Sequence, residues 1–238
     1  MIKAVIFDFD GTLSNRKANA YNLFRDYLRP FFKDFSEIEY EAVLQDLTTY
    51  DCNGTINVAY RLIPFYKKYG KYFSQEDGKI FSDWYYNHMG EYVVLKKQTI
   101  EILNGLYGKY KLGLITNGIS LTQHSKIENA KIDKYFDEII VSGDLEGNIE
   151  KPDKRIYEMM ANRLSVKPEE CVFVGDVFAS DILGAIRANM IPIWLVTDRE
   201  RPSSYEGIRI NEIDELPTIL ETLKWGKSSF LIWMKKVK

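Results

Sequence analysis

The chain has 238 residues, and its 32 Lys and Arg against 34 Asp and Glu give a formal net charge of −2. This balance argues against an electrostatic binder of nucleic acid polymers, and 45% hydrophobic residues exclude a mainly disordered chain. No apolar run approaches the roughly 18 residues of a membrane span, and the apolar start meets Asp8 too early for a signal peptide. We expect a cytoplasmic protein with no membrane partner.

The first predicted element is a buried strand at residues 3–7, KAVIF, which ends in the turn sequence DFDGTL. From residue 16 to about 92, apolar residues recur at intervals of three and four, which predicts four or five helices. Turn and cap residues divide these helices at Pro30, at residues 51–55 and at Gly70.

Beyond about residue 95, predicted strands alternate with predicted helices. The strands are LGLIT, EIIVS, CVFVG and IPIWLV, and a helical pattern precedes each of them. The alternation predicts an α/β fold, a Rossmann-like, doubly wound parallel sheet that also contains the first strand. We therefore expect a core domain of residues 1–14 and 95–238, with an α-helical cap domain of residues 15–94 inserted after the first strand.

Polar and acidic residues gather at or beside the predicted strand ends, where open α/β sheets bind their ligands. They are Asp8, Asp10, Thr116, Asn117, Lys151, Asp176 and Asp181. A phosphoester repels an incoming nucleophile unless positive charge covers its oxygens. Neighbouring carboxylates are the hard ligands that Mg²⁺ prefers, and a cation relieves their mutual repulsion. The pattern therefore predicts Mg²⁺-assisted chemistry on a phosphate group.

These residues form four motifs, DFDGT, LITN, KPD and GDVFASD, in this order along the chain. The motifs and their predicted elements resemble those of the haloacid dehalogenase superfamily, specifically its phosphatases with a helical cap after the first motif. The resemblance covers essentially the whole chain. It implies a Mg²⁺-dependent phosphomonoester hydrolase that acts on a small phosphorylated metabolite, a nucleotide or a sugar phosphate, as a monomer or homodimer.

The first two motifs supply the reacting groups. Asp8 is assigned as the nucleophile that forms an aspartyl-phosphate, as in the resembling family. Asp10 lies in the turn that follows and is assigned as the general acid and then base, and the resemblance adds its backbone carbonyl as a Mg²⁺ ligand. Thr116 and the backbone amide of Asn117 resemble the family's pair that binds the phosphoryl oxygens.

The last two motifs supply charge. Lys151 resembles the family's cationic clamp, and an ammonium beside Asp8 is expected to hold that carboxylate ionised. Asp176 is expected to complete the metal site with Asp8 and Asp10. Asp181 is expected to position Lys151 or a metal-bound water rather than to contact Mg²⁺.

Residues 51–55 lie between the second and third predicted cap helices, where related capped phosphatases have a substrate-specificity loop. Their polar side chains, Asn53 among them, are expected to reach a sugar hydroxyl or a base edge, and a plain helix–helix turn is the equal alternative. The stretch YDCNGTINVAYRLIPF is most similar to the branch with 5′-nucleotidases and N-acylneuraminate-9-phosphatases.

Three other functions stay open. A hexose-phosphate mutase is disfavoured because Ala20 stands where the members compared carry a His. A haloacid dehalogenase is disfavoured because it needs neither Asp10 nor Asp176. A non-catalytic binding protein is disfavoured because every catalytic position is filled. The apolar segment at residues 230–234 is expected to pack on the core or to form an interface.

Overall fold

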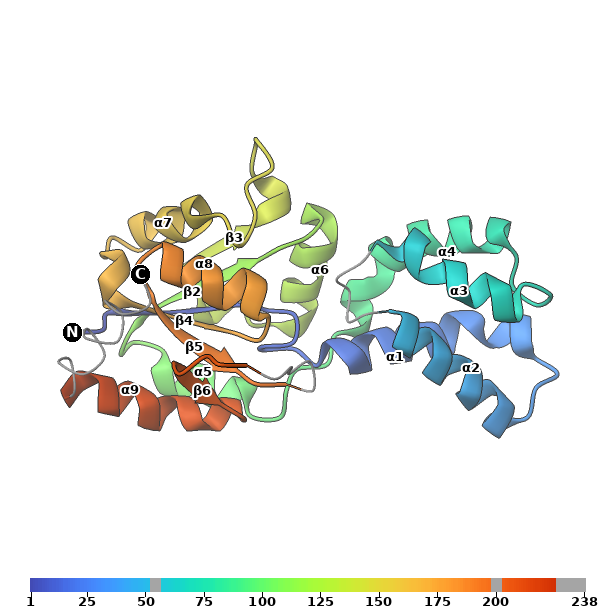
Figure 1. The fold of residues 1–238 in the computed structure, drawn as a ribbon, viewed down its shortest axis with the longest axis horizontal. Coiled ribbons are helices and arrows are strands. Elements are labelled where there is room, and N and C mark those ends of the chain that lie inside the picture. The colour runs from blue at the N-terminus through green and yellow to red at the C-terminus, as the bar shows by residue number, and fades with distance from the viewer. Residues whose placement is uncertain (52–56, 198–202, 226–238) are drawn as a thin grey trace. The chain divides into compact units, whose positions relative to one another are not determined.

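The computed structural model describes residues 1–51, 57–197 and 203–225. The chain divides into two compact units (Figure 1). The α/β unit comprises Met1–Leu13, Lys96–Ile119 and Ile132–Lys238, and the helical unit comprises Ser14–Leu95 and Ser120–Lys131. This division differs from the expected domains in assigning Ser120–Lys131 to the helical unit, and those expected boundaries stay a prediction.

The α/β unit contains a six-stranded sheet in the order β3-β2-β1-β4-β5-β6, with every pair of neighbours parallel. The strands are β1 (Ala4–Phe7), β2 (Lys111–Thr116), β3 (Glu138–Val141), β4 (Cys171–Gly175), β5 (Ile191–Leu195) and β6 (Ile208–Ile210). The predicted α/β fold is therefore confirmed. The strand β6 was not anticipated, because a three-residue strand gives too short a pattern to recognise.

Helices cover both faces of this sheet, as Figure 1 shows. They are α5 (Thr99–Leu106), α7 (Lys154–Arg163), α8 (Leu183–Arg187) and α9 (Leu216–Trp225). The central strand β1 is buried at all four positions, which explains its uninterrupted apolar sequence. Phe7 pairs with Leu114 on one side and Val174 on the other, so the carboxyl ends of β1, β2 and β4 meet at one edge.

The helical unit contains α1 (Arg16–Leu28), α2 (Glu37–Tyr50), α3 (Val58–Tyr69), α4 (Gln75–His88) and α6 (Ser120–Ala130). Two of these helices begin with a reciprocal capping box, Ser36 with Glu39 and Ser74 with Asp77. Such caps satisfy backbone N–H groups that the first helical turn leaves without partners. The predicted succession of cap helices is confirmed over residues 16–51 and 57–88.

Aromatic rings fill the centre of the helical unit. Five phenylalanines at this centre, each 2% exposed or less, are Phe24, Phe32, Phe65, Phe73 and Phe81. Their rings contact one another with centroids 5.8–6.3 Å apart, mostly edge to face. Aromatic residues therefore form much of the core of the helical unit.

A buried polar cluster also lies inside the helical unit. Asp51, which ends α2, forms ion pairs with Arg16 of α1 at 3.3 Å and with Arg61 of α3. The Tyr85 hydroxyl of α4 accepts hydrogen bonds from the same two guanidiniums, at 2.5 Å and 3.2 Å. We call these four residues the arginine cluster. It joins four helices through side chains that are all buried.

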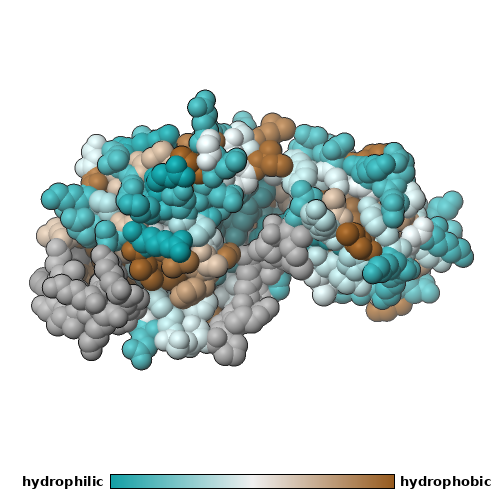
Figure 2. Space-filling model, turned by 45° about the horizontal axis from the view of Figure 1, so that its top comes forward, coloured by the Kyte–Doolittle hydropathy of each residue, from teal (hydrophilic) through white to brown (hydrophobic). Residues whose placement is uncertain are grey.

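Hydrophobic side chains that remain exposed are dispersed. On the face shown in Figure 2 they lie in small groups among hydrophilic residues. Over the described part of the chain, no helix has both the length and the hydropathy that a bilayer span requires.

Candidate active site

The carboxyl ends of the strands bring together charged side chains that are far apart in the sequence. Lys151 places its Nζ 2.5 Å from Oδ1 of Asp8 and 2.8 Å from Oδ1 of Asp181. Asp8 follows β1, and its backbone N–H donates to Val174 of β4, which fixes the start of the turn. All three charged side chains are buried.

Three carboxylates make up the centre of this site. Asp8, Asp176 and Asp181 each offer an oxygen, and these atoms lie within 4.8 Å of one another. We call these three residues with Lys151 the carboxylate cluster. Three carboxylates beside one ammonium provide hard oxygen ligands and negative charge, which suits a divalent cation.

Thr12 connects two members of the cluster. Its Oγ1 donates to Oδ2 of Asp8 at 3.0 Å and lies 3.4 Å from Oδ1 of Asp176. The residue is completely buried, one helical turn beyond Asp8. This contact was missed in the sequence, where the Thr of DFDGT has no charge that would mark it as functional.

Gly11 gives the Asp176 carboxylate its space. Its φ is +99°, and a Cβ at this position would lie 2.5 Å from Oδ2 of Asp176. Only glycine combines this backbone conformation with so close an approach. The glycine of the first motif therefore shapes the cluster as well as the turn.

Burial raises the pKa of Asp8 to about 7, and the negative charges of Asp181 and Asp176 act in the same direction. Lys151 lowers this pKa but does not outweigh burial. That Lys151 helps to hold Asp8 ionised therefore stays a prediction, and its ammonium is shared with the carboxylate of Asp181. A cation next to Asp8 would act in the same direction as Lys151 and lower this pKa further.

Lys151 stays charged in this environment. Burial acts to lower its pKa, but the carboxylates of Asp181 and Asp8 outweigh burial and raise the pKa above its usual value. The backbone of Lys151 is held by the side chain of Asn117, whose Oδ1 accepts from the Lys151 N–H and whose Nδ2 donates to the Lys151 carbonyl, both at 2.9 Å. The Asn117 side chain thus ties the second motif to the third, a role that the sequence did not reveal.

The loop after β2 carries the residues expected to bind phosphate. Thr116 ends this strand and is 1% exposed. After Asn117, the Gly118 N–H donates to the Ser142 hydroxyl at the end of β3, at 3.0 Å. Like Thr12, Ser142 was not predicted from the sequence, because its partner is a backbone amide.

Asp181 lies in the helical turn Phe178–Ile182, which follows β4. Its Oδ1 accepts from Lys151, and its Oδ2 accepts from the backbone N–H of Val177 at 2.8 Å. Behind it, the Tyr157 hydroxyl donates to the Ser180 carbonyl at 2.8 Å. Asp181 therefore holds the Lys151 ammonium in place. One of its carboxylate oxygens also lies within 4.8 Å of oxygens of Asp8 and Asp176.

Two predicted site residues remain, Asp10 and Asn53, and the structure describes the first of them. Asp10 lies in the turn after β1 and is partly buried. Its expected bond to a cation involves the backbone carbonyl and stays a prediction. Asn53 lies outside the described residues, and so does the segment at 230–234.

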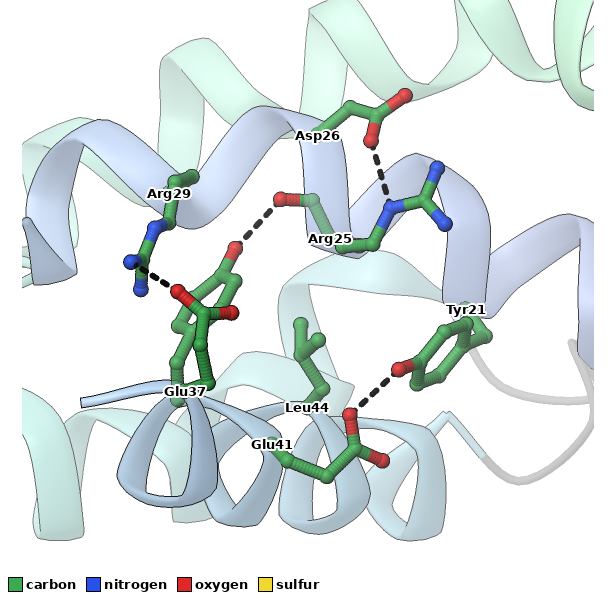
Figure 3. A pocket seen from close by; sticks show the side chains of 8 residues that line it. Tyr21, Arg25, Asp26, Arg29, Glu37, Glu41 and Leu44 are labelled. Carbon is green, nitrogen blue, oxygen red and sulfur yellow. Dashed lines mark hydrogen bonds and ion pairs between the residues drawn. The ribbon is translucent and has the colours of Figure 1, made fainter. Parts of the chain in front are cut away.

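A cavity of about 510 Å³ lies in the helical unit between α1 and α2 (Figure 3). Its charged walls pair with each other, Arg29 with Glu37 at 2.6 Å and Arg25 with Asp26 at 2.8 Å. The Tyr21 hydroxyl donates to Glu41 of the facing wall. The arginines of this cavity are paired with its acidic side chains. The carboxylate cluster is therefore the stronger candidate for the active site.

The family model of the haloacid dehalogenase-like hydrolases matches residues 5–196. The match covers β2 to β5, nearly all of β1, the helical insertion and every residue of the carboxylate cluster, and it ends before β6. The chain belongs to this family.

Two curated relatives extend the similarity over nearly the full length, and a third matches about half of the chain. The pyrimidine 5′-nucleotidase YjjG of Escherichia coli is 29% identical, over 91% of this chain and 96% of its own. The glyceraldehyde 3-phosphate phosphatase of Methanopyrus kandleri is 31% identical, over 91% of both chains. The human N-acylneuraminate-9-phosphatase is 31% identical over 56% of this chain and 54% of its own. The class of enzyme is a phosphatase of this family.

Solved structures share the fold. A HAD phosphatase from Thermococcus onnurineus has a TM-score of 0.60 and 27% identity, covering 92% of this chain and 98% of that one. The HAD hydrolase YfnB from Bacillus subtilis, solved with bound magnesium, has a TM-score of 0.67 and 24% identity, covering 92% and 99%.

Proposed function

We propose that this phosphatase hydrolyses small phosphomonoesters with the help of Mg²⁺, through an aspartyl-phosphate formed on Asp8. One observation carries the proposal: the Asp8 carboxylate is buried, held by Lys151 and Thr12, and surrounded by two further carboxylates. A nucleophile with this surrounding needs an added positive charge, and a phosphate ester needs the same charge on its oxygens.

The residues present fit a divalent cation. Asp8, Asp176 and Asp181 place carboxylate oxygens within 4.8 Å of one another beside the single ammonium of Lys151, a donor set that suits an added divalent cation. Asp8, Asp176 and the backbone carbonyl of Asp10 would hold Mg²⁺. When bound, Mg²⁺ supplies charge neutralisation between the attacking carboxylate and the phosphoryl oxygens.

In the first step of the proposed mechanism, Asp8 attacks the phosphorus atom and the bond to the leaving oxygen breaks. Asp10 donates a proton to that oxygen, so the product alcohol leaves neutral. Lys151, Thr116 and the Asn117 N–H bind the phosphoryl oxygens and stabilise the charge that spreads over them.

In the second step, water attacks the phosphorus of the aspartyl-phosphate. Asp10, now a carboxylate, accepts a proton from this water, and the P–O bond to Asp8 breaks to release inorganic phosphate. Asp181 holds Lys151 in place throughout, because its Oδ1 accepts from the Lys151 ammonium at 2.8 Å.

The proposed substrates are small metabolites with one phosphate ester, namely nucleoside monophosphates, triose phosphates and sugar acid phosphates. This range follows the names of the relatives, which include a pyrimidine 5′-nucleotidase, a glyceraldehyde 3-phosphate phosphatase and an N-acylneuraminate-9-phosphatase. We propose further that residues 51–55, with Asn53, contribute to the choice among them.

Phosphate release from a panel of these three substrate classes and an aryl phosphate tests the proposal, with Mg²⁺ and with EDTA. We expect release that requires Mg²⁺ and differs strongly between substrates. Transfer of phosphate within a sugar, without release, would instead indicate a mutase. Equal rates in EDTA would contradict the role of the cation.

A further inference from the structure

We propose that Trp194 is a positioning residue for Asp176, whose carboxylate it orients toward the cation. The inference deepens the proposed function and rests on it. Trp194 lies on β5, 18 residues beyond Asp176, and belongs to none of the four motifs. Its indole N–H donates to the backbone carbonyl of Asp176 at 3.1 Å.

This hydrogen bond acts where the chain leaves the sheet. Gly175, the last residue of β4, pairs with Trp194 on β5, so the indole stands beside the turn that begins at Asp176. A bond to the Asp176 carbonyl fixes the rotation of the peptide plane that follows the Asp176 Cα. The direction of the carboxylate depends on that backbone, because the side chain of aspartate is short.

The indole ring is itself held in place. Trp194 is 5% exposed, and the Phe178 ring contacts it with centroids 5.1 Å apart and planes at 68°. The Arg209 guanidinium lies 5.0 Å from the centre of the indole, and it donates to the Tyr205 carbonyl at 2.6 Å. A cation over the ring strengthens the indole N–H as a donor, so this arrangement favours a firm hydrogen bond.

Asp176 is thus constrained from two sides. A Cβ on Gly11 would lie 2.5 Å from Oδ2 of Asp176, so the glycine backbone packs directly against this carboxylate. The Thr12 hydroxyl contacts Oδ1 of Asp176. Trp194 holds its backbone from the opposite end of the residue. Partners that orient a metal ligand without touching the metal typically change the affinity by about 10- to 100-fold when they are removed.

The test is Trp194→Phe, which keeps an aromatic ring but removes the N–H donor. Mg²⁺ affinity is measured without substrate, by calorimetry and by the rise of the melting temperature with Mg²⁺ concentration. We expect Mg²⁺ to bind about tenfold more weakly. At saturating Mg²⁺ we expect kcat to stay within about threefold of the wild type, since the reacting groups are unchanged.

Phe178→Leu is the matched control. It removes an aromatic neighbour of the same indole but leaves the N–H bond to Asp176, so we expect unchanged Mg²⁺ affinity. Should Trp194→Phe not fold, Arg209→Leu removes the cation over the indole instead, and we expect about threefold weaker binding of Mg²⁺.

Unchanged Mg²⁺ affinity in Trp194→Phe, or equal weakening in Trp194→Phe and Phe178→Leu, would overturn the positioning role and leave the proposed function intact. If the wild-type protein itself binds no Mg²⁺, both the proposed function and this inference are wrong.

Discussion

Both units of the molecule bury charged side chains, but they hold them in different ways. In the α/β unit, Asp8 follows β1, and Asp176 and Asp181 follow β4. The glycine backbone at Gly11 leaves room for the Asp176 carboxylate. In the helical unit, the arginine cluster lies among four helices, and Asp51 contacts two guanidiniums at once.

The difference separates two uses of buried charge. Carboxylates crowded together raise one another's pKa and favour a cation, which is a property of a reactive site. In the arginine cluster, the Asp51 carboxylate pairs with two guanidiniums, and the ion pairs and hydrogen bonds connect the helices. We therefore expect substitutions in the carboxylate cluster to change activity, and substitutions in the arginine cluster to change stability.

The largest expected effect is the loss of activity in Asp8→Asn. An amide cannot form the aspartyl-phosphate, so we expect phosphate release to fall by roughly 10⁴-fold or more. The free energy of unfolding at pH 7 should be equal or higher, because the variant removes a buried carboxyl next to Asp181 and Asp176. Steady-state kinetics and urea unfolding measure the two quantities. Substantial residual hydrolysis would show that another residue is the nucleophile.

Asp51→Asn is expected to lower stability, whereas Asp8→Asn lowers activity. The variant leaves the buried guanidiniums of Arg16 and Arg61 without their carboxylate partner, which should lower the free energy of unfolding by about 3–5 kcal/mol. Urea unfolding measures this change. Asp26→Asn is the control, since the Arg25–Asp26 pair is about half exposed and should contribute less than about 1 kcal/mol.

An Asp51→Asn variant as stable as the wild type would contradict the assignment of the arginine cluster to stability.

The stability of the metal-free protein should depend on pH through Asp8. The pKa of Asp8 is about 7 in the folded protein and has an ordinary value of 3.8, so the folded state binds more protons between these two pH values. The free energy of unfolding should therefore fall as the pH rises from about 4 to about 7, by a few kcal/mol at about 1.4 kcal/mol per unit.

Urea unfolding in EDTA at several pH values measures this dependence, with Asp8→Asn as the reference that lacks the group. Mg²⁺ should weaken the dependence by stabilising the ionised carboxylate. Identical pH profiles of the wild type and Asp8→Asn would contradict the raised pKa.

The smallest effect should come from Tyr85→Phe. The variant removes a hydroxyl that accepts hydrogen bonds from Arg16 and Arg61 but leaves both ion pairs with Asp51. We expect a loss of about 1–2 kcal/mol in the free energy of unfolding, smaller than that of Asp51→Asn. A loss as large as that of Asp51→Asn would mean that the hydroxyl, rather than the carboxylate, holds the cluster together.

The sheet and the meeting of Asp8 with Asp176 could be predicted because parallel strands end at one edge. This rule needs only the strands and the residues that follow them. The approach of Lys151 rested on the family resemblance, since its motif follows no strand.

Contacts to the backbone could not be predicted in the same way. The Asn117 side chain binds the backbone of Lys151, 34 residues away, and Trp194 binds the carbonyl of Asp176. A backbone group is present at every position, so the sequence gives no signal for which one a side chain will bind. Asp51 illustrates a related limit, because the sequence suggested a polar loop residue and the structure buries it between two arginines.

The most direct test of the central claim is to trap the phosphorylated aspartate. In Asp10→Asn, an aryl phosphate with a good leaving group still reacts without the general acid, but the general base for hydrolysis is missing, so the intermediate should accumulate. Borohydride reduces an acyl phosphate to an alcohol, which converts the trapped aspartate into homoserine. We expect mass spectrometry to find homoserine at position 8. Homoserine at another position, or phosphate release with none formed at position 8, would contradict the account.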